Sequence, residues 1–503
     1  MVLNPSGGAD DMPTARSPGA AAELQFRMKR PQRHRLLHGY PLAAAMPSAD
    51  HLGPHADIGI DALRPHIVGI LPHPFCNPAV TGCGFCTFPH EAGNAAKATA
   101  VVECVMKEVE NAVLLGKIAP MTNPVAALYF GGGTANMVEP EPFTELCQGL
   151  DLVFDLKNAE VTLEGVPAYF LRGHPLLIDA MREHLKARHF RISMGIQTFD
   201  EARLKQMGRT AFGNASTFAK VVELGHQNAF TVSGDLLFNL PGQRLDEMKV
   251  DVRRAIDLGY DHLGLYHLVL FRGLDAAWAE DDSLLAELPD NERAAANWVE
   301  LRELLLDGGF VQTSLTNFER VEFRGNPLRY VYEEHSFEPD RYQAIGFGPS
   351  AASYTATPDF GHAVKTVNPT SAEAYMKAVN NGNRVFDRCY GYGRRDQKVF
   401  WIIRRLAALD IDRNHYRELF QTDPLEDFPA EFAAARDTGL VEITDANIRP
   451  TPAGMFYSDS IASVIALERV REVRAWQLAG KRKQVHRGLI HDSRANSNAH
   501  GHM

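Results

Sequence analysis

The chain has 503 residues, of which 45% are hydrophobic and 23% charged, and its formal net charge is −10. This balance is typical of a globular protein and unlike that of a disordered chain. The negative charge argues against a general nucleic-acid surface, and no apolar run approaches the ~18 residues that a membrane span requires. We therefore expect a cytoplasmic protein that acts on a small molecule, with no nucleic-acid partner and no membrane span.

The first 60 residues are rich in Ala, Pro, Gly and Arg, and Arg27–Arg35 is a basic run without a helical period. Such a composition favours disorder. We therefore predict an N-terminal extension over residues 1–60 that is partly disordered, with no regular structure over about the first 25 residues.

Short apolar runs alternate with amphipathic stretches between residues 61 and 375. Predicted strands are His66–Leu71, Val125–Phe130, Glu160–Leu163, Arg191–Ile196, Thr231–Phe238 and Leu263–Leu270. Helical spacing follows the first strand from Val101 to Leu114, and it recurs over Leu176–Leu185 and Leu245–Leu258. Strands that alternate with such helices indicate parallel βαβ units. We predict an α/β fold with a partial (β/α)₆ barrel.

The alternation ends near residue 376, where a different pattern begins. Asp396–Leu409, Asn414–Phe420 and Ala430–Thr438 have helical spacing, and short apolar strands follow near Leu440–Ile443. This order predicts a small helical or winged-helix-like domain over residues 376–478. The polar tail, residues 479–503, is expected to be disordered.

Three of the six cysteines, Cys76, Cys83 and Cys86, fall within eleven positions directly after the first predicted strand. That place is the C-terminal mouth of a barrel, where barrel enzymes carry their sites. Thiolates are the usual ligands of iron–sulfur clusters, and three of them would leave the fourth iron of a [4Fe–4S] cube open. A Cys₃His zinc site that uses His73 or His90, or a set of inert thiols, are the alternatives.

Of the remaining cysteines, Cys104 and Cys147 lie on helical patterns and are expected in the core. Cys389 is nearer the domain junction, where it could line a substrate cleft. Near the last predicted strand, His262, Tyr266 and His267 could face the barrel mouth and bind substrate or move a proton, or be satisfied core side chains.

A glycine run, Tyr129–Thr134 (YFGGGT), follows the second predicted strand. Glycines let backbone groups approach a ligand closely, although the same run could only make a tight turn. Together with the motifs below, this glycine motif makes the chain resemble the radical SAM superfamily. Within it, the chain resembles the branch of oxygen-independent coproporphyrinogen III dehydrogenase, its haem-chaperone relatives and class C radical SAM methyltransferases. The matching words span residues 66 to 380 in the family's order: HPFC at His73–Cys76, CGFC at Cys83–Cys86, YFGGGT at Tyr129–Thr134, TLEGVP at Thr162–Pro167, GIQTFD at Gly195–Asp200, MGR at Met207–Arg209, DLLFNLPGQ at Asp235–Gln243 and IGFGPSAAS at Ile345–Ser353.

The resemblance implies two cofactors, a [4Fe–4S] cluster held by Cys76, Cys83 and Cys86, and S-adenosylmethionine (SAM), of which two molecules could bind. It places the methionyl amino group of SAM at Gly132, Gly133 and Thr134. The carboxylate or ribose contacts would come from Glu164, Gln197, Arg209 and Asp235, while Phe85 would cover the cluster and the adenine. Each polar residue also has a structural alternative, an ion pair for Glu164 or Arg209 and a local cap for Gln197 or Asp235.

The implied reaction begins with reductive cleavage of SAM to a 5′-deoxyadenosyl radical, with the electron supplied by a reduced flavodoxin or ferredoxin-type donor. We expect the radical to serve methylation, methylene transfer or cyclopropanation of a secondary metabolite or tetrapyrrole. The alternatives are oxidative decarboxylation of a coproporphyrinogen-like substrate, and a haem-binding chaperone that retains the scaffold.

Three departures from the family pattern bear on this choice. Six residues, Asn77–Gly82, separate the first two cysteines where the family usually has three. Ile70 replaces a common Tyr, and Phe88 stands where the coproporphyrinogen enzyme has a further Cys. The missing Cys argues against porphyrinogen decarboxylation, and the enlarged loop could line a pocket for a second SAM or for the substrate.

Overall fold

The computed structural model describes residues 19–32, 40–41, 43–48, 61, 64–76, 83–88, 91–92, 95–122, 124–270, 272–273, 276–382 and 385–475. The Asn77–Gly82 loop, His90 and the predicted tail over residues 479–503 lie outside these residues.

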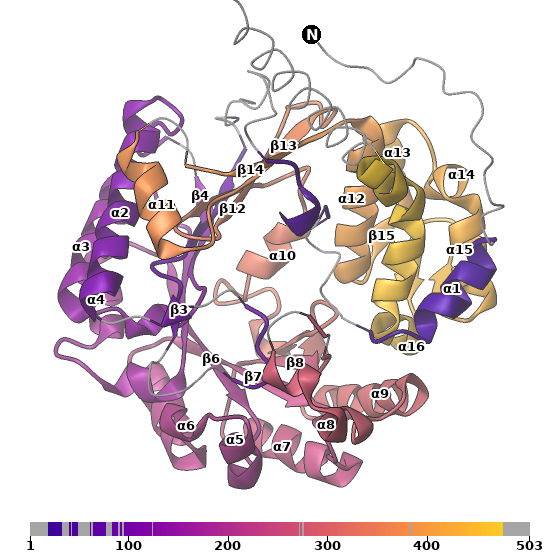
Figure 1. Ribbon diagram of the computed structural model, residues 1–503, viewed down its shortest axis with the longest axis horizontal. Coiled ribbons are helices and arrows are strands. Elements are labelled where there is room, and N and C mark those ends of the chain that lie inside the picture. The colour runs from indigo at the N-terminus through magenta and orange to yellow at the C-terminus, as the bar shows by residue number, and fades with distance from the viewer. Residues whose placement is uncertain are drawn as a thin grey trace, which may run out of the picture.

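A curved sheet of parallel strands forms the centre of the molecule (Figure 1). Its parallel strands, in spatial order, are β11 (Gln343–Phe347), β1 (His66–Ile70), β4 (Val125–Phe130), β5 (Glu160–Gly165), β6 (His189–Gln197), β7 (Thr231–Phe238) and β8 (His262–His267). Each of the six predicted strands is present. The sequence did not predict β11, which pairs with β1 and adds a seventh parallel strand.

Antiparallel strands extend both ends of this sheet. Beyond β8 lie β10 (Asn317–Arg320) and β9 (Phe310–Gln312); beyond β11 lie β12 (Ala352–Ala356), β13 (Ala363–Val367) and β14 (Arg388–Tyr392). Within the described residues the two edges do not pair with each other, so the barrel is open as predicted. Because β14 belongs to this sheet, the sheet continues past residue 375.

Helices pack around the outside of the curved sheet (Figure 1). They are α2 (Ala95–Leu114), α3 (Pro140–Val153), α4 (Leu177–His184), α5 (Glu201–Gln206), α6 (Ala215–Gln227), α7 (Leu245–Asp257), α8 (Asp282–Ala286), α9 (Asn291–Asp307) and α11 (Ala372–Asn380). Helix α10 (Tyr332–Ser336) instead lies in the middle of the view, where Tyr332 packs on Tyr129 with ring centroids 4.7 Å apart. Short 3₁₀ turns are η2 (Ala43–Ala45), η5 (Ala135–Met137), η6 (Pro167–Leu171), η7 (Thr210–Phe212), η8 (Ala277–Glu280) and η9 (Val321–Phe323).

Helix α2 shows why these segments fold as predicted. Val101, Val102, Val105 and Val109 recur at helical spacing and are all buried against the sheet. Cys104 and Cys147 are also buried in the helix layer, which confirms them as core thiols. Cys389 lies in β14 and is 1% exposed.

The C-terminal part of the described chain has the order helix, strand, three helices, two strands and two further helices. It contains α12 (Arg394–Ala407), β15 (Ile411–Asp412), α13 (Arg413–Phe420), α14 (Pro424–Asp427), α15 (Pro429–Asp437), β16 (Val441–Ile443), β17 (Asn447–Pro450) and α16 (Pro452–Phe456), then a helix over 458–475. The small sheet has the order β15-β17-β16. The predicted helical C-terminal region is therefore present, while its description as a winged-helix-like domain over residues 376–478 stays a prediction.

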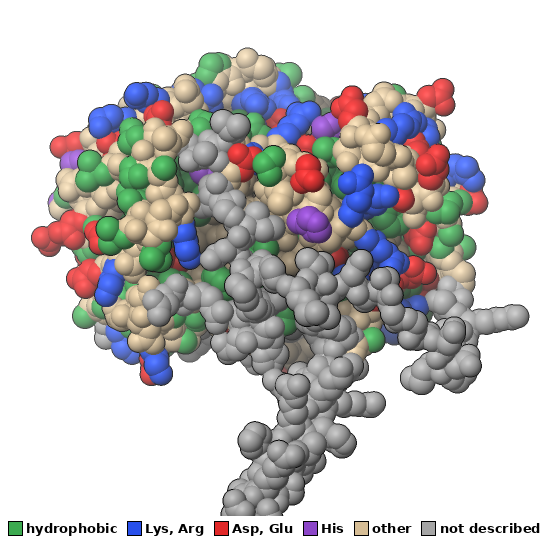
Figure 2. Space-filling view, turned by 90° about the horizontal axis from the view of Figure 1, so that it is seen from above, with side chains coloured by type: hydrophobic (Ala, Val, Ile, Leu, Met, Phe, Trp, Pro, Cys, Tyr) green, Lys and Arg blue, Asp and Glu red, His purple; other side chains and the backbone are tan. Residues whose placement is uncertain are grey.

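Helix α1 (Ala20–Met28) corrects one expectation, because structure begins before residue 25. Its alanine run favours a helix, and Leu24 is buried where α1 packs beside α15 (Figure 1). No helix among the described residues is long and apolar enough to cross a membrane. On the face seen in Figure 2, acidic and basic side chains are interspersed.

Candidate iron–sulfur and SAM site

Three half-buried thiols come together beyond the end of β1. Cys76 ends the short strand β2 (Phe75–Cys76), which pairs in parallel with β3 (Glu91–Ala92). Cys83 and Cys86 lie in one turn, in which the Cys86 N–H donates to the Cys83 carbonyl at 3.0 Å. Electrostatic interactions join the three thiols to one another and to the Arg209 guanidinium. The predicted cluster ligands therefore share one site.

Burial raises the pKa of both Cys76 and Cys86. The Thr134 hydroxyl, which donates to Cys76 Sγ at 3.6 Å, and Arg209 partly offset this effect at Cys76. Burial thus disfavours the negative thiolates, which are the metal-binding form, and the positive charge of bound iron would stabilise them. The donor set of three converging thiols fits a cubane with one open iron.

The glycine run after β4 lies directly against the chain that leads to Cys76. Gly132 and Gly133 have positive φ values of 81° and 52°. A Cβ atom on Gly133 would lie 2.9 Å from the His73 carbonyl oxygen, and one on Gly132 would lie 2.8 Å from the Leu71 side chain. Both the turn and the close packing therefore require glycine, whatever ligand also binds there.

The end of β6 carries an irregular backbone beside the thiols. The register shifts between Gly195 and Gln197, and Gln197 adopts a left-handed φ of 66°. Arg209 bridges this irregularity to the thiols, since Nη2 donates to the Gly195 carbonyl at 2.5 Å and Nη1 contacts Cys83 Sγ at 3.1 Å. A non-glycine residue in this conformation is uncommon and typical of functional sites.

Two carboxylates, Glu164 and Asp235, face the barrel interior around Tyr129. A Cβ atom on Gly131 would lie 3.0 Å from Glu164 Oε2. Asp235 stands opposite Gly264, the neighbouring residue on β8, where a Cβ atom would overlap its carboxylate. After burial, the Glu164 charge is the next largest cause that raises the pKa of Tyr129, and Asp235 acts in the same direction.

An aromatic cover lies over the cysteine turn. The backbone N–H of Trp278 donates to the Gly84 carbonyl at 2.8 Å. The Trp278 ring meets the Phe85 ring edge to face, with centroids 6.1 Å apart. Trp278 is only 6% exposed. The sequence did not single it out, because an isolated Trp in an irregular segment carries no local signal for its partner.

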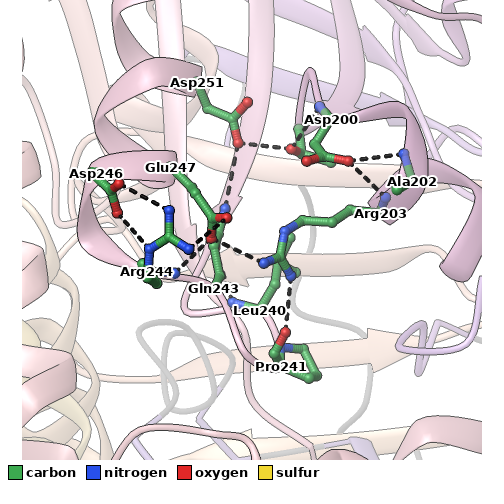
Figure 3. A network of polar contacts seen from close by, with 11 residues as sticks. Asp200, Ala202, Arg203, Leu240, Pro241, Gln243, Arg244, Asp246, Glu247 and Asp251 are labelled. Atoms are coloured by element: carbon green, nitrogen blue, oxygen red, sulfur yellow. Dashed lines mark hydrogen bonds and ion pairs between the residues drawn. The ribbon is translucent and has the colours of Figure 1, made fainter.

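A buried carboxylate ties together the turns after β6 and β7 (Figure 3). Asp251 of α7 accepts from the Thr198 hydroxyl at 2.7 Å and from the Phe199 N–H at 2.8 Å. The Gln243 amide also donates to it, at 3.4 Å. Thr198 and Gln243, one polar residue from each of these two motifs, thus brace the mouth.

Comparisons with known proteins agree with this geometry. The solved structure of coproporphyrinogen III oxidase HemN from Escherichia coli superposes with a TM-score of 0.68 at 19% identity, over 88% of this chain and 98% of that one. The heme chaperone HemW of Lactococcus lactis is 24% identical over 350 residues, 68% of this chain and 82% of the relative. The anaerobilin synthase of E. coli O157:H7 is 31% identical over 196 residues, 39% of this chain and 41% of the relative.

The chain is therefore similar in sequence to proteins of the radical SAM superfamily and shares the fold of one of them. Within that superfamily, the relatives that it resembles are those of the HemN-like branch. No family model matches the sequence. The matched regions cover 82% of the HemW chaperone but only 41% of the anaerobilin synthase.

The expected cofactors, a [4Fe–4S] cluster and SAM, are those of this radical SAM branch, which confirms the cofactor prediction at the level of the family. The structure brings Cys76, Cys83, Cys86, Phe85, Gly132, Gly133, Thr134, Glu164, Gln197, Arg209 and Asp235 to the mouth and upper interior of the barrel. Their individual contacts with cofactors stay a prediction.

The zinc alternative lacks support among the described residues, where no group of three His, Cys, Asp or Glu side chains could hold a metal ion. Ligands of a cubane bind different irons and stand further apart than the ligands of one ion. His73 accepts the Phe75 N–H through Nδ1 at 3.2 Å, and burial lowers its pKa to about 4.

His262 does not lie at the mouth, which corrects that interpretation. It begins β8, so it lies at the opposite end of the barrel, where it is 3% exposed. Its Nδ1 lies 2.7 Å from the Ser233 hydroxyl and 3.1 Å from Arg191 Nη2. His267 ends the same strand but packs its ring against Phe456.

Proposed function

We propose that the chain is an enzyme that cleaves SAM reductively at a cluster held by Cys76, Cys83 and Cys86, and uses it for methylation, methylene transfer or cyclopropanation of a secondary metabolite or tetrapyrrole. The observation that carries this proposal is the meeting of the three thiols with Arg209 beside the glycine turn. The absence of the family's additional Cys, replaced by Phe88, favours these reactions over coproporphyrinogen decarboxylation.

When bound, the cluster and SAM would supply the one-electron chemistry that produces a 5′-deoxyadenosyl radical. The protein's own part is to bind and orient. Arg209 offers a guanidinium fork for a carboxylate, Thr134 an acceptor for an amino group, and Asp235 an acceptor for ribose hydroxyls.

The lining also protects the reaction. Trp278 and Phe85 cover the cysteine turn with apolar surface, and Trp278 packs with Leu240, Leu268 and neighbouring apolar residues. Exclusion of water from this side strengthens every charge interaction at the mouth.

The experiment that tests the proposal combines anaerobic reconstitution with SAM that carries an isotopically labelled methyl group. Products from a candidate metabolite or tetrapyrrole mixture are then followed by mass spectrometry. A product in which the labelled methyl carbon of SAM is bonded to a substrate carbon supports the proposal. Cleavage of SAM without any label transfer, together with loss of carbon dioxide from coproporphyrinogen, would favour decarboxylation instead.

A haem chaperone is the second candidate, because the HemW relative aligns over 82% of its own length. Haem titration of the reconstituted chain separates the two. Tight haem binding without substrate-dependent SAM turnover would favour the chaperone.

A further inference from the structure

The segment that leads into Cys76 is held between two glycine turns. On one side lies Gly133, as described above. On the other side lies Gly348, which has a φ of 103°, and a Cβ atom there would overlap the Leu71 carbonyl. The Leu71 N–H also donates to the Phe347 carbonyl at 2.8 Å. The path of Leu71–Cys76 therefore depends on where the Gly348 turn stands.

A carboxylate from the outer helix layer fixes that turn. Glu108 of α2 is buried and accepts the Gly348 N–H at 2.8 Å. It also accepts the Asn368 amide at 2.8 Å and the Tyr375 hydroxyl at 2.6 Å. The same Asn368 amide donates to the Gly348 carbonyl at 3.0 Å, so both sides of the Gly348 peptide are bound.

Helix α11 connects this brace to the cluster strands a second time. Its Tyr375 reaches Glu108, while the N–H of Ala372 at its first turn donates to Glu91 Oε1 at 2.8 Å. Glu91 belongs to β3, the partner of the strand that contains Cys76, and its N–H donates to the Pro74 carbonyl at 3.0 Å. Two routes of contact thus run from one buried cluster of side chains to the same thiol.

We propose that Glu108 is a positioning residue for the iron–sulfur cluster, acting through the Gly348 turn and α11 on the chain that carries Cys76. The inference rests on the proposed function, since it needs a cluster at Cys76. Charge-assisted hydrogen bonds in a buried site are short and directional, and shifts near 1 Å in a reactive centre have large effects.

Two substitutions test this proposal in the full-length, anaerobically reconstituted chain. Glu108→Gln keeps the shape but places an amide N–H₂ against a donor, and Gly348→Ala presses a methyl group on Leu71. In both, at a pH above about 7 where Glu108 is ionised, we expect an iron chelator to remove the cluster about tenfold faster, which for Glu108→Gln is the effect of one lost charge-assisted hydrogen bond. The electron paramagnetic resonance spectrum of the reduced cluster should change as well.

Matched controls separate positioning from general damage. Gly116→Ala also adds a side chain to a glycine with a positive φ, 68°, but with open space around its Cβ position. Asp396→Asn alters a buried carboxylate of α12, which accepts the Tyr390 hydroxyl at 2.8 Å and takes no part in the mouth contacts described above. Both should keep the wild-type chelation rate and spectrum.

Thermal unfolding first shows that Glu108→Gln is folded. The proposal is overturned if this folded variant keeps both the wild-type chelation rate and the wild-type spectrum. Should Gly348→Ala fail to fold, Glu108→Gln alone decides. A wild-type chain that holds no cluster would instead overturn the proposed function.

Discussion

The mouth and the floor of the barrel carry polar residues of different kinds. At the mouth, thiols, glycines and the left-handed Gln197 stand at the C-terminal ends of the strands. At the floor, where the strands begin, Arg191 stacks on Tyr330 with its Cζ atom 3.8 Å from the ring centroid. Glu160 there accepts the Val331 N–H at 2.9 Å.

The difference shows how one set of strands serves two purposes. The floor is a buried network in which charged side chains contact Tyr330 and Val331, which cover this end of the open barrel. The mouth keeps its reactive groups half-buried and holds them by braces from outside. We therefore expect changes at the mouth to remove cofactors and changes at the floor to reduce stability.

The largest effect is expected at the cluster ligands. Replacement of Cys76, Cys83 or Cys86 by Ala should abolish reductive SAM cleavage, because each thiolate holds one iron. Iron content and 5′-deoxyadenosine formation measure this, while the thermal unfolding midpoint of the cluster-free protein should not change. A triple variant with normal cluster content would show that the ligands lie elsewhere.

At the floor, Arg191→Met should lower the free energy of unfolding by about 3 kcal/mol, because it leaves buried Glu160 without its cation. Urea denaturation of the cluster-free chain measures this. Stability within 0.5 kcal/mol of the wild type, a size typical of surface substitutions, would contradict a structural floor.

SAM affinity is expected to respond to the upper interior of the barrel. Arg209→Ala and Asp235→Asn should weaken SAM binding roughly 10- to 150-fold, an effect of ~1.5–3 kcal/mol, while the cluster remains. Equilibrium binding to the reconstituted protein measures this. Unchanged affinity in both variants would reassign the two residues to structural roles.

The smallest effect concerns pH. Burial raises the pKa of Glu108 from 4.5 to about 7, against the opposing effects of its hydrogen-bond donors and of Lys117. The folded chain thus holds this proton more tightly, so its contribution to stability is complete below pH 4.5 and is lost as the pH rises through about 7. Relative to Glu108→Gln, wild-type stability should fall by about 1 kcal/mol per pH unit between roughly pH 5 and pH 7. Parallel pH profiles of the two proteins would contradict this assignment.

The sequence predicted the mouth well because the residues of the mouth lie in short contiguous motifs. The cysteines and the glycine run each follow a strand, and parallel strands bring the motifs that follow them to the same end of the sheet. The sequence did not predict the contact between Glu108 and Gly348. These residues are 240 positions apart, and no local pattern around either one indicates its partner. His262 precedes the predicted strand Leu263–Leu270, so it lies at the floor, and of its two interpretations the core side chain is the one that holds.

The predicted elements divide in the same way. Strands with β-branched residues, such as Val125–Phe130 and Thr231–Phe238, match their predicted bounds. Strand β11 was missed because Gly346 interrupts its apolar pattern, and α1 was missed because its helix is stabilised by packing against distant α15.

Mössbauer spectroscopy of the chain reconstituted with ⁵⁷Fe tests the central claim most directly. If Cys76, Cys83 and Cys86 hold three irons and leave one open, addition of SAM should change the signal of one iron in four. Four irons that all stay unchanged on addition of SAM would contradict the account.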